Sequence, residues 1–599
     1  MTSWLERALG FEGVNAIYRA LPADTTATNF FDRVLDVMAV RYSLVARSDN
    51  PFPEEGPVMA VANHPFGGVD GLILGSLLSR FRPDARLIVN RMLLNIPEMA
   101  PRIIPVDVFG GPQAVRANLD GMRSCIRALK AGNCLGTFPA GEVAHWEYGK
   151  GLVESPWSPH LAELALRTGA TVVPIYFEGR NSPLFHLLGA LHERLRTLQL
   201  PREFVNKQSS APIAVLGDPI RPERLSRFRD ADEATAYLRL QTFLLRGRIL
   251  RPKRRAFRRF FSIPADGGSP RESCWDPVAE PRDRASLERE IATLRSGARL
   301  LRQGRFDVFA VRRGEIPKMM EEIGRLRERT FREAHEGTGK RLDLDAFDDT
   351  YWHLFLWDRE SREVAGAYRI GLTGEMLSRW GQKGFYTHTL FQMRNGFLEE
   401  LHPAMELGRS FITPEYQKKH ASLALLWKGI GAFVAQRPEY RYLFGPVSID
   451  KEYQSLSRDI MVQYLTEKTG EARLARRVRP RNPLGKGGLR KEEREALGRF
   501  AEDIQSVSAL ISEVESSGKG VPILLKHYIR LNARLLALNV DPAFNDSVDS
   551  LMIVDLPAVE PRLLRHYMGP DAAAAYIRRH AVGCDDAGAQ GALREGSPR

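Results

Sequence analysis

The chain has 599 residues, 43% of them hydrophobic and 9% aromatic, and its 86 lysines and arginines against 73 acidic residues give a formal net charge of +13. This length is too great for one ordinary core and the composition excludes a largely disordered chain, so we expect at least two folded domains. The basic excess indicates an acidic partner, which is an anionic membrane, nucleic acid or an acidic carrier protein.

Cysteine usage and the lack of long apolar runs limit where the chain works. Its four cysteines are scattered without metal-ligand spacing, so the sequence predicts neither a disulfide framework nor a metal site and favours a reducing compartment. The first residues, MTSWLERALGFEG, contain an early acid and no long apolar core. No run of about 18 apolar residues occurs, so we predict no signal peptide and no transmembrane helix.

Apolar runs and helical patterns alternate through the first half of the chain. This alternation predicts an α/β domain over residues 1–261, in which ligands bind where strand ends meet helix starts. The apolar runs cover residues 57–62, 86–90, 102–106, 134–138, 171–177 and 212–216, and the helical patterns include 69–80, 112–130 and 159–168.

The first of these runs leads into a histidine followed by an acid. In VMAVANHPFGGVDG the strand stops at Asn63-His64, and Asp70 stands where the next helix begins. A histidine oriented by a carboxylate is a general-base arrangement. A turn histidine next to an acid that the helix dipole favours would give the same pattern, so this stretch alone leaves both interpretations open.

Three further motifs follow in order: RIIPVDVFGG, GTFPAGEVAHW and VVPIYFEGR. Together with the histidine motif they resemble the glycerolipid acyltransferase family over roughly residues 40–225. The resemblance implies that His64 is the base and Asp70 its orienting carboxylate, with an acyl thioester as donor and no cofactor. It also implies a set of substrate-binding residues: Gly67, Gly68, Phe138, Pro139, Gly141 and Glu142.

The sequence departs from that family in two places. Five residues instead of four separate His64 from Asp70, and the two glycines between them could absorb the extra one in a wider turn. The Phe-Pro block has its acid two places later, at Glu142, and lacks the family's arginine. We therefore expect an acceptor without a glycerol phosphate, with Glu142 meeting either a cationic head group or solvent.

Residues 243–261, FLLRGRILRPKRRAFRRFF, combine arginines with aromatic and aliphatic residues. This mixture suits an anionic membrane surface, although nucleic acid or a solvated helix face would also explain it. We favour the membrane and predict no nucleic-acid partner, because no nucleic-acid-binding motif accompanies the segment. The next stretch, 262–284, is rich in Pro, Gly and Ser and is predicted to be a linker.

The second half contains predicted strands near 306–311, 352–357, 364–371 and 441–446. Its motifs RLRERTFR, DLDAFDD, VAGAYRIG and ELGRSFITPEYQ resemble the acyl-carrier-protein-dependent branch of the GNAT fold, which homoserine-lactone synthases and ornithine N-acyltransferases share. We expect a GNAT-like α+β domain over 285–568, with a basic exposed insertion near 470–500 and a disordered tail over 569–599. The site residues implied are Arg327, Phe331, Asp345, Asp348, Arg369, Glu406 and Arg409.

The roles of these residues follow from the chemistry of an amine acceptor. Glu406 is expected to act as base, directly or through water, and Arg369 and Arg409 to hold the carboxylate of an amino acid. The two resemblances together imply a bifunctional aminolipid synthase such as the ornithine lipid synthases. Its partners would be acyl carrier protein, an anionic membrane, an amino acid and a lyso-lipid, and it would be cytoplasmic, peripheral on the inner membrane.

Two alternatives remain open from the sequence. One is a lysophospholipid acyltransferase fused to a degenerate GNAT module. The other is a non-catalytic basic protein that binds membranes, which the unusual His–Asp spacing keeps in consideration.

Overall fold

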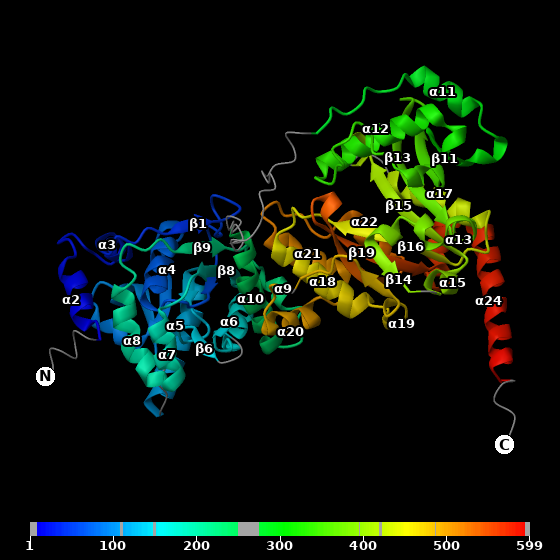
Figure 1. Cartoon of the computed structure of the whole chain (residues 1–599). Coiled ribbons are helices and arrows are strands. Elements are labelled where there is room, and N and C mark those ends of the chain that lie inside the picture. Colours follow the sequence, from blue (N-terminus) through cyan, green and yellow to red (C-terminus); the bar gives the residue numbers. More distant parts are fainter. Residues whose placement is uncertain are drawn as a thin grey trace, which may run out of the picture. The chain divides into compact units, whose positions relative to one another are not determined.

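The computed structural model describes residues 9–107, 112–147, 151–249, 275–394, 396–417, 422–485 and 487–592. The chain forms two compact units, each with its own sheet (Figure 1). Unit 1 comprises residues 1–256 and 488–520, and unit 2 comprises residues 257–487 and 521–599.

Unit 1 contains a seven-stranded sheet in the order β1-β9-β8-β2-β5-β3-β4. Five strands run parallel to one another, whereas β9 is antiparallel to β8 and β1 is parallel to β9. The predicted α/β fold is therefore confirmed. The strands are β1 Ser43–Val45, β2 Val58–Ala62, β3 Arg86–Asn90, β4 Ile103–Val106, β5 Cys134–Thr137, β8 Thr171–Glu178 and β9 Ile213–Leu216, and β6 His145–Glu147 and β7 Gly151–Val153 form a separate hairpin.

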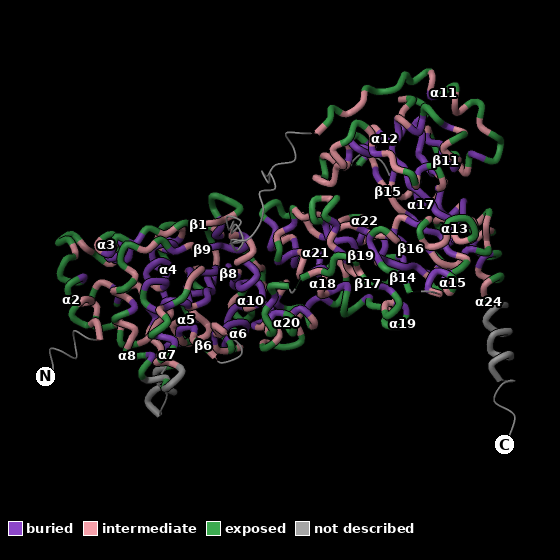
Figure 2. The backbone as a smooth tube through the Cα atoms, viewed as in Figure 1, coloured by how far each residue is buried: buried purple, intermediate pink, exposed green. Residues whose placement is uncertain are grey.

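The interior of unit 1 around its sheet is buried (Figure 2). Strand β2, in the middle of the sheet, is apolar at every position and wholly buried, as expected for a parallel strand covered on both faces. Helix α4 is buried on most of its surface, because it packs between the sheet and α3. A Cβ atom on Gly75 would lie 2.6 Å from the Phe31 ring, so glycine allows this close approach. The helices are α2 Phe11–Arg19, α3 Phe30–Val37, α4 Gly68–Phe81, α5 Pro112–Lys130, α6 His160–Thr168, α7 Pro183–Leu191, α8 Glu193–Val205, α9 Pro222–Leu225 and α10 Ala231–Leu244.

Unit 2 contains an eight-stranded sheet in the order β10-β11-β12-β13-β15-β16-β19-β18. Its strands are antiparallel except for β15 and β16, which run parallel. The strands are β10 Arg299–Gln303, β11 Phe306–Arg312, β12 Trp352–Asp358, β13 Glu363–Leu372, β15 Ala404–Ile412, β16 Tyr442–Ile449, β18 Arg534–Asp541 and β19 Ser547–Asp555, and β14 Phe391–Met393 pairs with β17 Val478–Pro480.

Two long helices, α12 and α17, pack against the strands of this sheet (Figure 1). The helices of unit 2 are α11 Arg284–Ala292, α12 Pro317–Glu333, α13 Thr373–Trp380, α14 Thr387–Leu390, α15 Phe397–Leu401, α16 Pro414–Gln417, α17 Ser422–Ala435, α18 Ser455–Thr469, α19 Ala472–Ala475, α22 Ile523–Arg530, α23 Pro561–Met568 and α24 Pro570–Ala592. The predicted linker lies outside the described residues up to residue 274, and Trp275 onward already packs on unit 2, where Arg332 lies over the Trp275 ring.

The prediction of a disordered tail is wrong for much of its length. Residues 570–592 form helix α24, whose buried Tyr576 donates a hydrogen bond to the carbonyl of Tyr440 at 2.8 Å. The alanine-rich composition indicated disorder, but alanine is also the best helix former, and Tyr576 fixes the helix to the domain. Residues 593–599 lie outside the described residues.

The prediction of an exposed insertion near 470–500 is also wrong in part. Residues 488–520 belong to unit 1, where α20 Lys491–Phe500 and α21 Ile504–Val514 lie beside α10 (Figure 1). Phe500 is buried with its ring centre 5.6 Å from that of Phe228. The charged residues that suggested a solvated loop occupy one face of a helix, and its apolar face packs on the domain.

The described part of the basic segment 243–261 does not present its charges to a membrane. Phe243 is buried, Arg246 pairs with Glu493, and the buried Arg248 donates to the carbonyls of Leu216 and Glu513. Residues 250–261 lie outside the described residues. Among the described helices none is long and apolar enough to cross a bilayer.

The Arg246–Glu493 pair should be important for the stability of unit 1, because both side chains are mostly buried, with 14% and 7% of their surface exposed. Glu493→Gln leaves an uncompensated buried guanidinium, so we expect the local stability of α10 and α20 to fall by about 3 kcal/mol. Hydrogen exchange of peptides from these helices measures this. Asp120→Asn, which breaks an exposed pair with Arg123, serves as control, and equal protection in the two variants would contradict the expectation.

Candidate active sites

The predicted His–Asp pair forms in unit 1 despite the extra residue between its members. His64 follows β2, Asp70 lies in the first turn of α4, and Nδ1 of His64 is 3.1 Å from Oδ1 of Asp70. The glycines between them explain how. Gly67 adopts φ +94°, which favours glycine, and a Cβ atom on Gly68 would lie 2.6 Å from the ring of Phe204.

Backbone donors and an aromatic ring hold this pair in place. The fully buried Asp70 accepts hydrogen bonds from the backbone N–H groups of Phe66 at 2.9 Å, Gly67 at 3.3 Å and Gly71 at 3.0 Å. The ring of His64 stacks on Phe138 with 4.0 Å between ring centres. Because Nδ1 faces Asp70, Nε2 is left to meet a substrate, and the side chain of His64 keeps 17% of its surface exposed.

A second acid in this site, Glu154, was not found by the sequence analysis. One of its carboxylate oxygens accepts the backbone N–H of His64 at 2.8 Å, and the other accepts the indole N–H of Trp157 at 3.3 Å. Burial raises the pKa of Glu154 to about 7, against the opposing hydrogen bonds and nearby positive charges. Burial also lowers the pKa of His64, but the charges of Asp70 and Glu154 and the contact with Asp70 outweigh it, so the pKa of His64 lies above its ordinary value.

The predicted Phe-Pro block lies beside the pair. Phe138 forms the stack described above, the carbonyl of Pro139 accepts a hydrogen bond from Ser158 at 3.3 Å, and Gly141 turns the chain with φ +69°. Glu142 pairs with Arg196 of α8 and accepts a hydrogen bond from Ser155. Glu142 therefore has an arginine of this chain as its partner and keeps 38% of its side-chain surface exposed, so it also meets solvent, which is one of the two predicted alternatives. A contact with a cationic head group stays a prediction.

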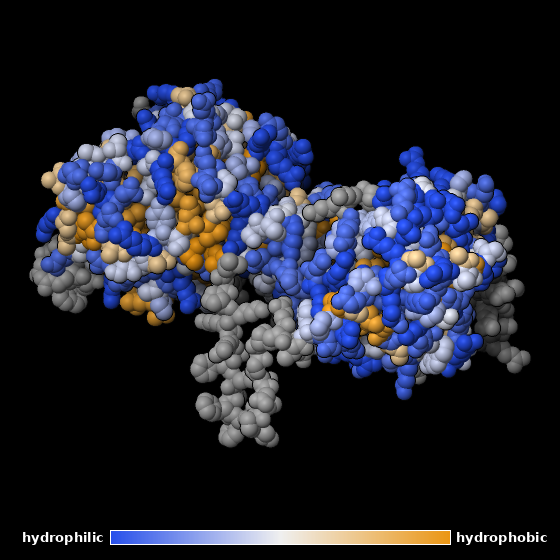
Figure 3. Space-filling view, turned by 90° about the horizontal axis from the view of Figure 1, so that it is seen from above, coloured by the Kyte–Doolittle hydropathy of each residue, from blue (hydrophilic) through white to orange (hydrophobic). Residues whose placement is uncertain are grey.

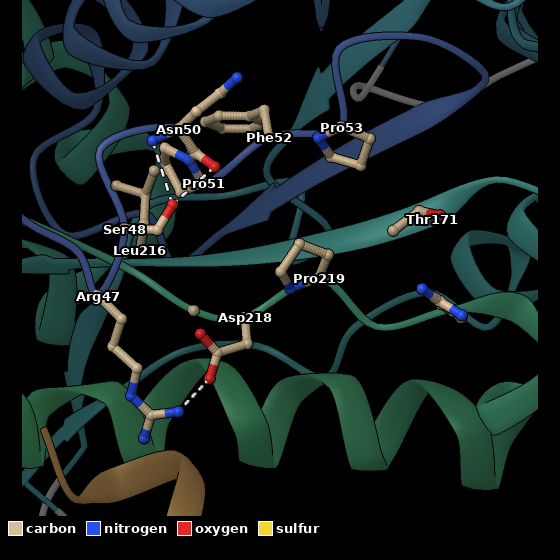
Figure 4. Close-up of a pocket in the computed structure, with 12 residues that line it drawn as sticks. Arg47, Ser48, Asn50, Pro51, Phe52, Pro53, Thr171, Leu216, Asp218 and Pro219 are labelled. Carbon is tan, nitrogen blue, oxygen red and sulfur yellow. Dashed lines mark hydrogen bonds and ion pairs between the residues drawn. The ribbon is translucent and has the colours of Figure 1, made fainter. Parts of the chain in front are cut away.

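A cavity of about 410 Å³ elsewhere in unit 1 is separate from this site (Figure 4). It is lined by Arg47, Phe52, Thr171 and Asp218, and Arg47 pairs with Asp218 across it. Thr171 begins β8, whereas His64 follows the far end of the parallel neighbour β2. The cavity therefore lies at one end of these parallel strands, and His64 lies at the other end.

The predicted residues of unit 2 also come together, mainly as a buried network of arginines and aspartates. Arg327 contacts Asp348 and Asp343 at 2.9 Å each, and Arg369 contacts Asp345 at 2.6 Å and Asp348 at 3.3 Å. Burial acts to raise the pKa of Asp348, but the charges of Arg327 and Arg369 hold it well below its ordinary value. Asp343 is a member that the sequence analysis missed.

The two arginines expected to hold a carboxylate differ in access. Arg369 is only 1% exposed, and its guanidinium carbon lies 4.9 to 5.6 Å from the ring centres of Phe347, Tyr351 and Tyr386. This leaves Arg369 no surface for a substrate, so we assign it to positioning. Arg409 is 9% exposed, its ion pairs are longer, 3.5 Å to Asp345 and 3.6 Å to Asp343, and its guanidinium carbon lies 5.0 and 4.6 Å from the ring centres of Tyr386 and Phe544. Nε of Arg409, like Nε and Nη2 of Arg369, has no hydrogen-bond partner among the described residues.

Glu406 is almost completely buried, with both carboxylate oxygens in use. It accepts the backbone N–H of Thr387 at 2.7 Å and the hydroxyl of Tyr351, which in turn accepts the N–H of Tyr386 at 2.9 Å. Burial raises the pKa of Glu406. Any action on a substrate would therefore pass through Tyr351 and the 386–387 turn. Phe331 lies in α12, is partly buried and packs against the core.

Comparisons with known proteins agree with both halves of this description. A family model described as Acyltransferase matches residues 1–250, and one described as Acetyltransferase (GNAT) domain matches residues 326–428. A glycine N(alpha)-acyltransferase of Phocaeicola vulgatus is 30% identical over 276 residues, which cover 43% of this chain and 83% of that protein.

Two further relatives are similar to smaller shares of the chain. A lyso-glycine lipid O-acyltransferase of Phocaeicola vulgatus is 29% identical over 28% of this chain and 61% of its own length. An L-ornithine N(alpha)-acyltransferase of Agrobacterium fabrum is 26% identical over 39% of this chain and 74% of its own length.

The folds and these matches define an acyltransferase enzyme with two acyltransferase domains in one chain. The chain belongs to the same family as the glycine N(alpha)-acyltransferases.

Asp70 should control the protonation of His64. Asp70→Asn removes the negative charge that favours the imidazolium and leaves the burial, so we expect the pKa of His64 to fall below about 6.5. NMR titration of histidine-labelled protein measures this. Glu163→Gln, beside the exposed His160 at 3.1 Å, is the control and should leave His64 unchanged. An unchanged His64 pKa in Asp70→Asn would show that the two groups are not coupled.

Proposed function

We propose that the chain makes a diacylated aminolipid in two steps. Unit 2 joins a 3-hydroxyacyl group to the α-amine of an amino acid such as ornithine, and unit 1 then esterifies the 3-hydroxyl with a second acyl group. The observation that carries this proposal is that one chain is similar both to amino-acid N-acyltransferases and to a lyso-lipid O-acyltransferase.

The geometry around His64 supports the esterification. Nε2 takes the proton of the 3-hydroxyl as its oxygen attacks the thioester carbonyl, the carbon–sulfur bond breaks, and the thiol leaves with a proton. Asp70 fixes the ring through Nδ1 at 3.1 Å and stabilises the imidazolium that forms. The thioester is already activated, so no enzyme nucleophile is required. The engagement of Glu142 by Arg196 supports an acceptor without phosphate.

The amide-forming step requires a neutral α-amine that attacks a second thioester. Arg409, whose guanidinium is incompletely paired, holds the carboxylate of the amino acid. Glu406 orients the site through Tyr351, and the amine proton leaves with the thiol.

The remaining partners are also part of this proposal. Acyl carrier proteins are acidic, so the net charge of +13 supports one as acyl donor. Both products carry acyl chains, so we place the enzyme peripherally on the cytoplasmic face of the inner membrane. On the face shown in Figure 3 the surface is mostly hydrophilic and hydrophobic residues gather in patches.

The His64 variant separates the two steps. His64→Ala should reduce O-acylation by about 10²–10⁴-fold, because the general base is lost, while N-acylation continues and the monoacylated lipid accumulates. Wild-type O-acylation should fall as pH drops through a value above about 6.5, since the raised pKa of His64 leaves less neutral imidazole.

The complementary variants are Glu406→Gln and Arg409→Ala. Both should stop formation of the monoacylated lipid from the free amino acid and leave esterification of supplied monoacylated lipid intact. Products are separated by mass spectrometry.

Two results would contradict these expectations. Diacylated lipid formed at the wild-type rate by His64→Ala would refute the role of His64. Loss of both activities in a folded Arg409→Ala protein would refute the independence of the two sites.

We expect the helical hairpin formed by α7 and α8 to contact the membrane. Leu187 on α7 is 64% exposed, Leu198 on α8 is 45% exposed, and Trp146 in the adjacent β6 is 47% exposed. Replacing all three by serine should reduce flotation with anionic vesicles, because burial of leucine and tryptophan at the interface is lost. Ile523→Ser, at a 74% exposed position of unit 2, is the control. Undiminished flotation of the triple variant would place the contact elsewhere.

A further inference from the structure

The β6–β7 hairpin of unit 1 holds the main chain of His64 from both of its ends. Ala144, directly before β6, donates its backbone N–H to the carbonyl of His64 at 2.9 Å. Glu154, directly after β7, accepts the backbone N–H of His64 at 2.8 Å. One hairpin therefore binds both polar main-chain groups of a histidine that itself follows strand β2.

The segment that continues from the hairpin, residues 154–158, also holds the Phe-Pro block. The backbone N–H of Ser158 donates to the carbonyl of Pro139 at 3.3 Å. Phe138 of the same block stacks on the ring of His64 with 4.0 Å between ring centres. This segment therefore links the main chain of the histidine to the residues that pack against its ring.

The negative charge of Glu154 calls for an explanation beyond these hydrogen bonds. Glu154 is 5% exposed, and its second carboxylate oxygen accepts the indole N–H of Trp157 at 3.3 Å. A neutral glutamine in its place could accept the N–H of His64 through its amide oxygen, whereas a buried carboxylate costs free energy. A purely structural acceptor would account for the hydrogen bond to His64 but not for the charge.

The cations around Glu154 identify what the charge acts on. Arg239 of α10 donates to the main-chain carbonyl of Glu154 at 3.1 Å, and its charge is shared with Glu492 and Glu493 of α20. Burial raises the pKa of Glu154 to about 7, against its hydrogen bonds and the charges of His64 and Arg239. Of these two cations, His64 is the one whose charge changes during the reaction.

His64 thus lies between two acids with different contacts. Asp70 faces Nδ1 of the ring at 3.1 Å, and Glu154 binds the main chain from which the ring extends. The charges of both acids raise the pKa of His64, whereas burial lowers it. Because charges interact strongly where water is excluded, both acids stabilise the imidazolium.

We propose that Glu154 is a positioning residue of the esterification site. Its carboxylate fixes the main chain of His64 and adds a second negative charge to that of Asp70, which stabilises the imidazolium formed when Nε2 takes the hydroxyl proton. Glu154 acts through His64 and contacts neither the thioester nor the hydroxyl. This role rests on the esterification proposed above.

The test begins with Glu154→Gln in the full-length protein. Esterification is measured with N-(3-hydroxypalmitoyl)ornithine as acceptor and palmitoyl-acyl carrier protein as donor. We expect kcat to fall by about 10–100-fold with little change in KM, because the base is held and stabilised less well. The acidic limb of the pH–rate profile should move to lower pH, because loss of the Glu154 charge lowers the pKa of His64.

NMR titration of histidine-labelled protein measures the pKa of His64 without any substrate. This pKa should fall in Glu154→Gln and stay near the wild-type value in Glu154→Asp, which keeps the charge. The shorter aspartate should still lower kcat by about 10-fold, because it withdraws the carboxylate from the main chain of His64. Glu203→Gln is the matched control, since Glu203 is 2% exposed and accepts the backbone N–H of Ser182 at 3.0 Å. It should leave the pKa of His64 unchanged.

The outcomes separate this inference from the proposed function. Folded Glu154→Gln with wild-type kcat and an unchanged His64 pKa would overturn the inference, and so would Glu154→Asp with wild-type kcat. Failure of both variants to fold would assign Glu154 to the stability of unit 1 and would also overturn it. If the wild type esterifies no acceptor while the pKa of His64 falls in Glu154→Gln, the proposed function is wrong and the coupling of Glu154 to His64 stands.

Discussion

A carboxylate removed from water has to be compensated by donors, and both units are organised around carboxylates that are almost entirely buried. Three backbone N–H groups compensate Asp70, two arginines compensate Asp348, and Tyr351 with the N–H of Thr387 compensates Glu406. Because the fold fixes these donors, each buried acid has a fixed position and holds a neighbouring side chain. Asp70 holds His64 in unit 1, and Asp348 holds two arginines in unit 2.

Burial also separates the side chains that could contact a substrate from those that only position their neighbours. Arg327, Arg369 and Asp348 are ion-paired with one another inside the protein and have almost no exposed surface, and Nε and Nη2 of Arg369 have no hydrogen-bond partner among the described residues. His64 and Arg409 are more accessible, with 17% and 9% of their side-chain surface exposed. The candidate chemistry of each unit is therefore assigned to a side chain that has a buried acidic partner and is reachable from outside.

Apolar patterning predicted the strand and the helix that position His64 and Asp70, and in unit 2 it predicted β13 but not β15, which carries Glu406 and Arg409. The run at 57–62 is strand β2 Val58–Ala62, and the pattern at 69–80 is helix α4 Gly68–Phe81. The motif resemblance identified His64 and Asp70, and the structure brings them to 3.1 Å. Strand β19 Ser547–Asp555 was missed because Ser547, Asp549 and Ser550 are polar yet buried. A strand that is buried on both faces and carries polar residues among its buried positions gives no alternation between apolar and polar residues.

Contacts between residues that lie far apart in the sequence could not be predicted from the sequence. Glu154 binds the backbone of a residue 90 positions away, and Arg196 reaches Glu142 across 54 positions. Neither contact leaves a local pattern, since each depends on how the elements pack. The assignment of residues 488–520 to unit 1 also depends on long-range packing and could not be predicted. The charges of helix α20 predicted a solvated segment, but its apolar face, with Leu497 and Phe500, is buried.

The proposed function requires that one chain carry out both acylations of the same aminolipid. The most direct measurement is mass spectrometry of the lipids of a bacterial host that makes no aminolipids and expresses this chain. We expect a new lipid without phosphorus, in which an amino acid carries an amide-linked 3-hydroxyacyl group whose 3-hydroxyl is esterified by a second acyl group. A host that gains no aminolipid and shows only altered acyl chains in its phospholipids would contradict it.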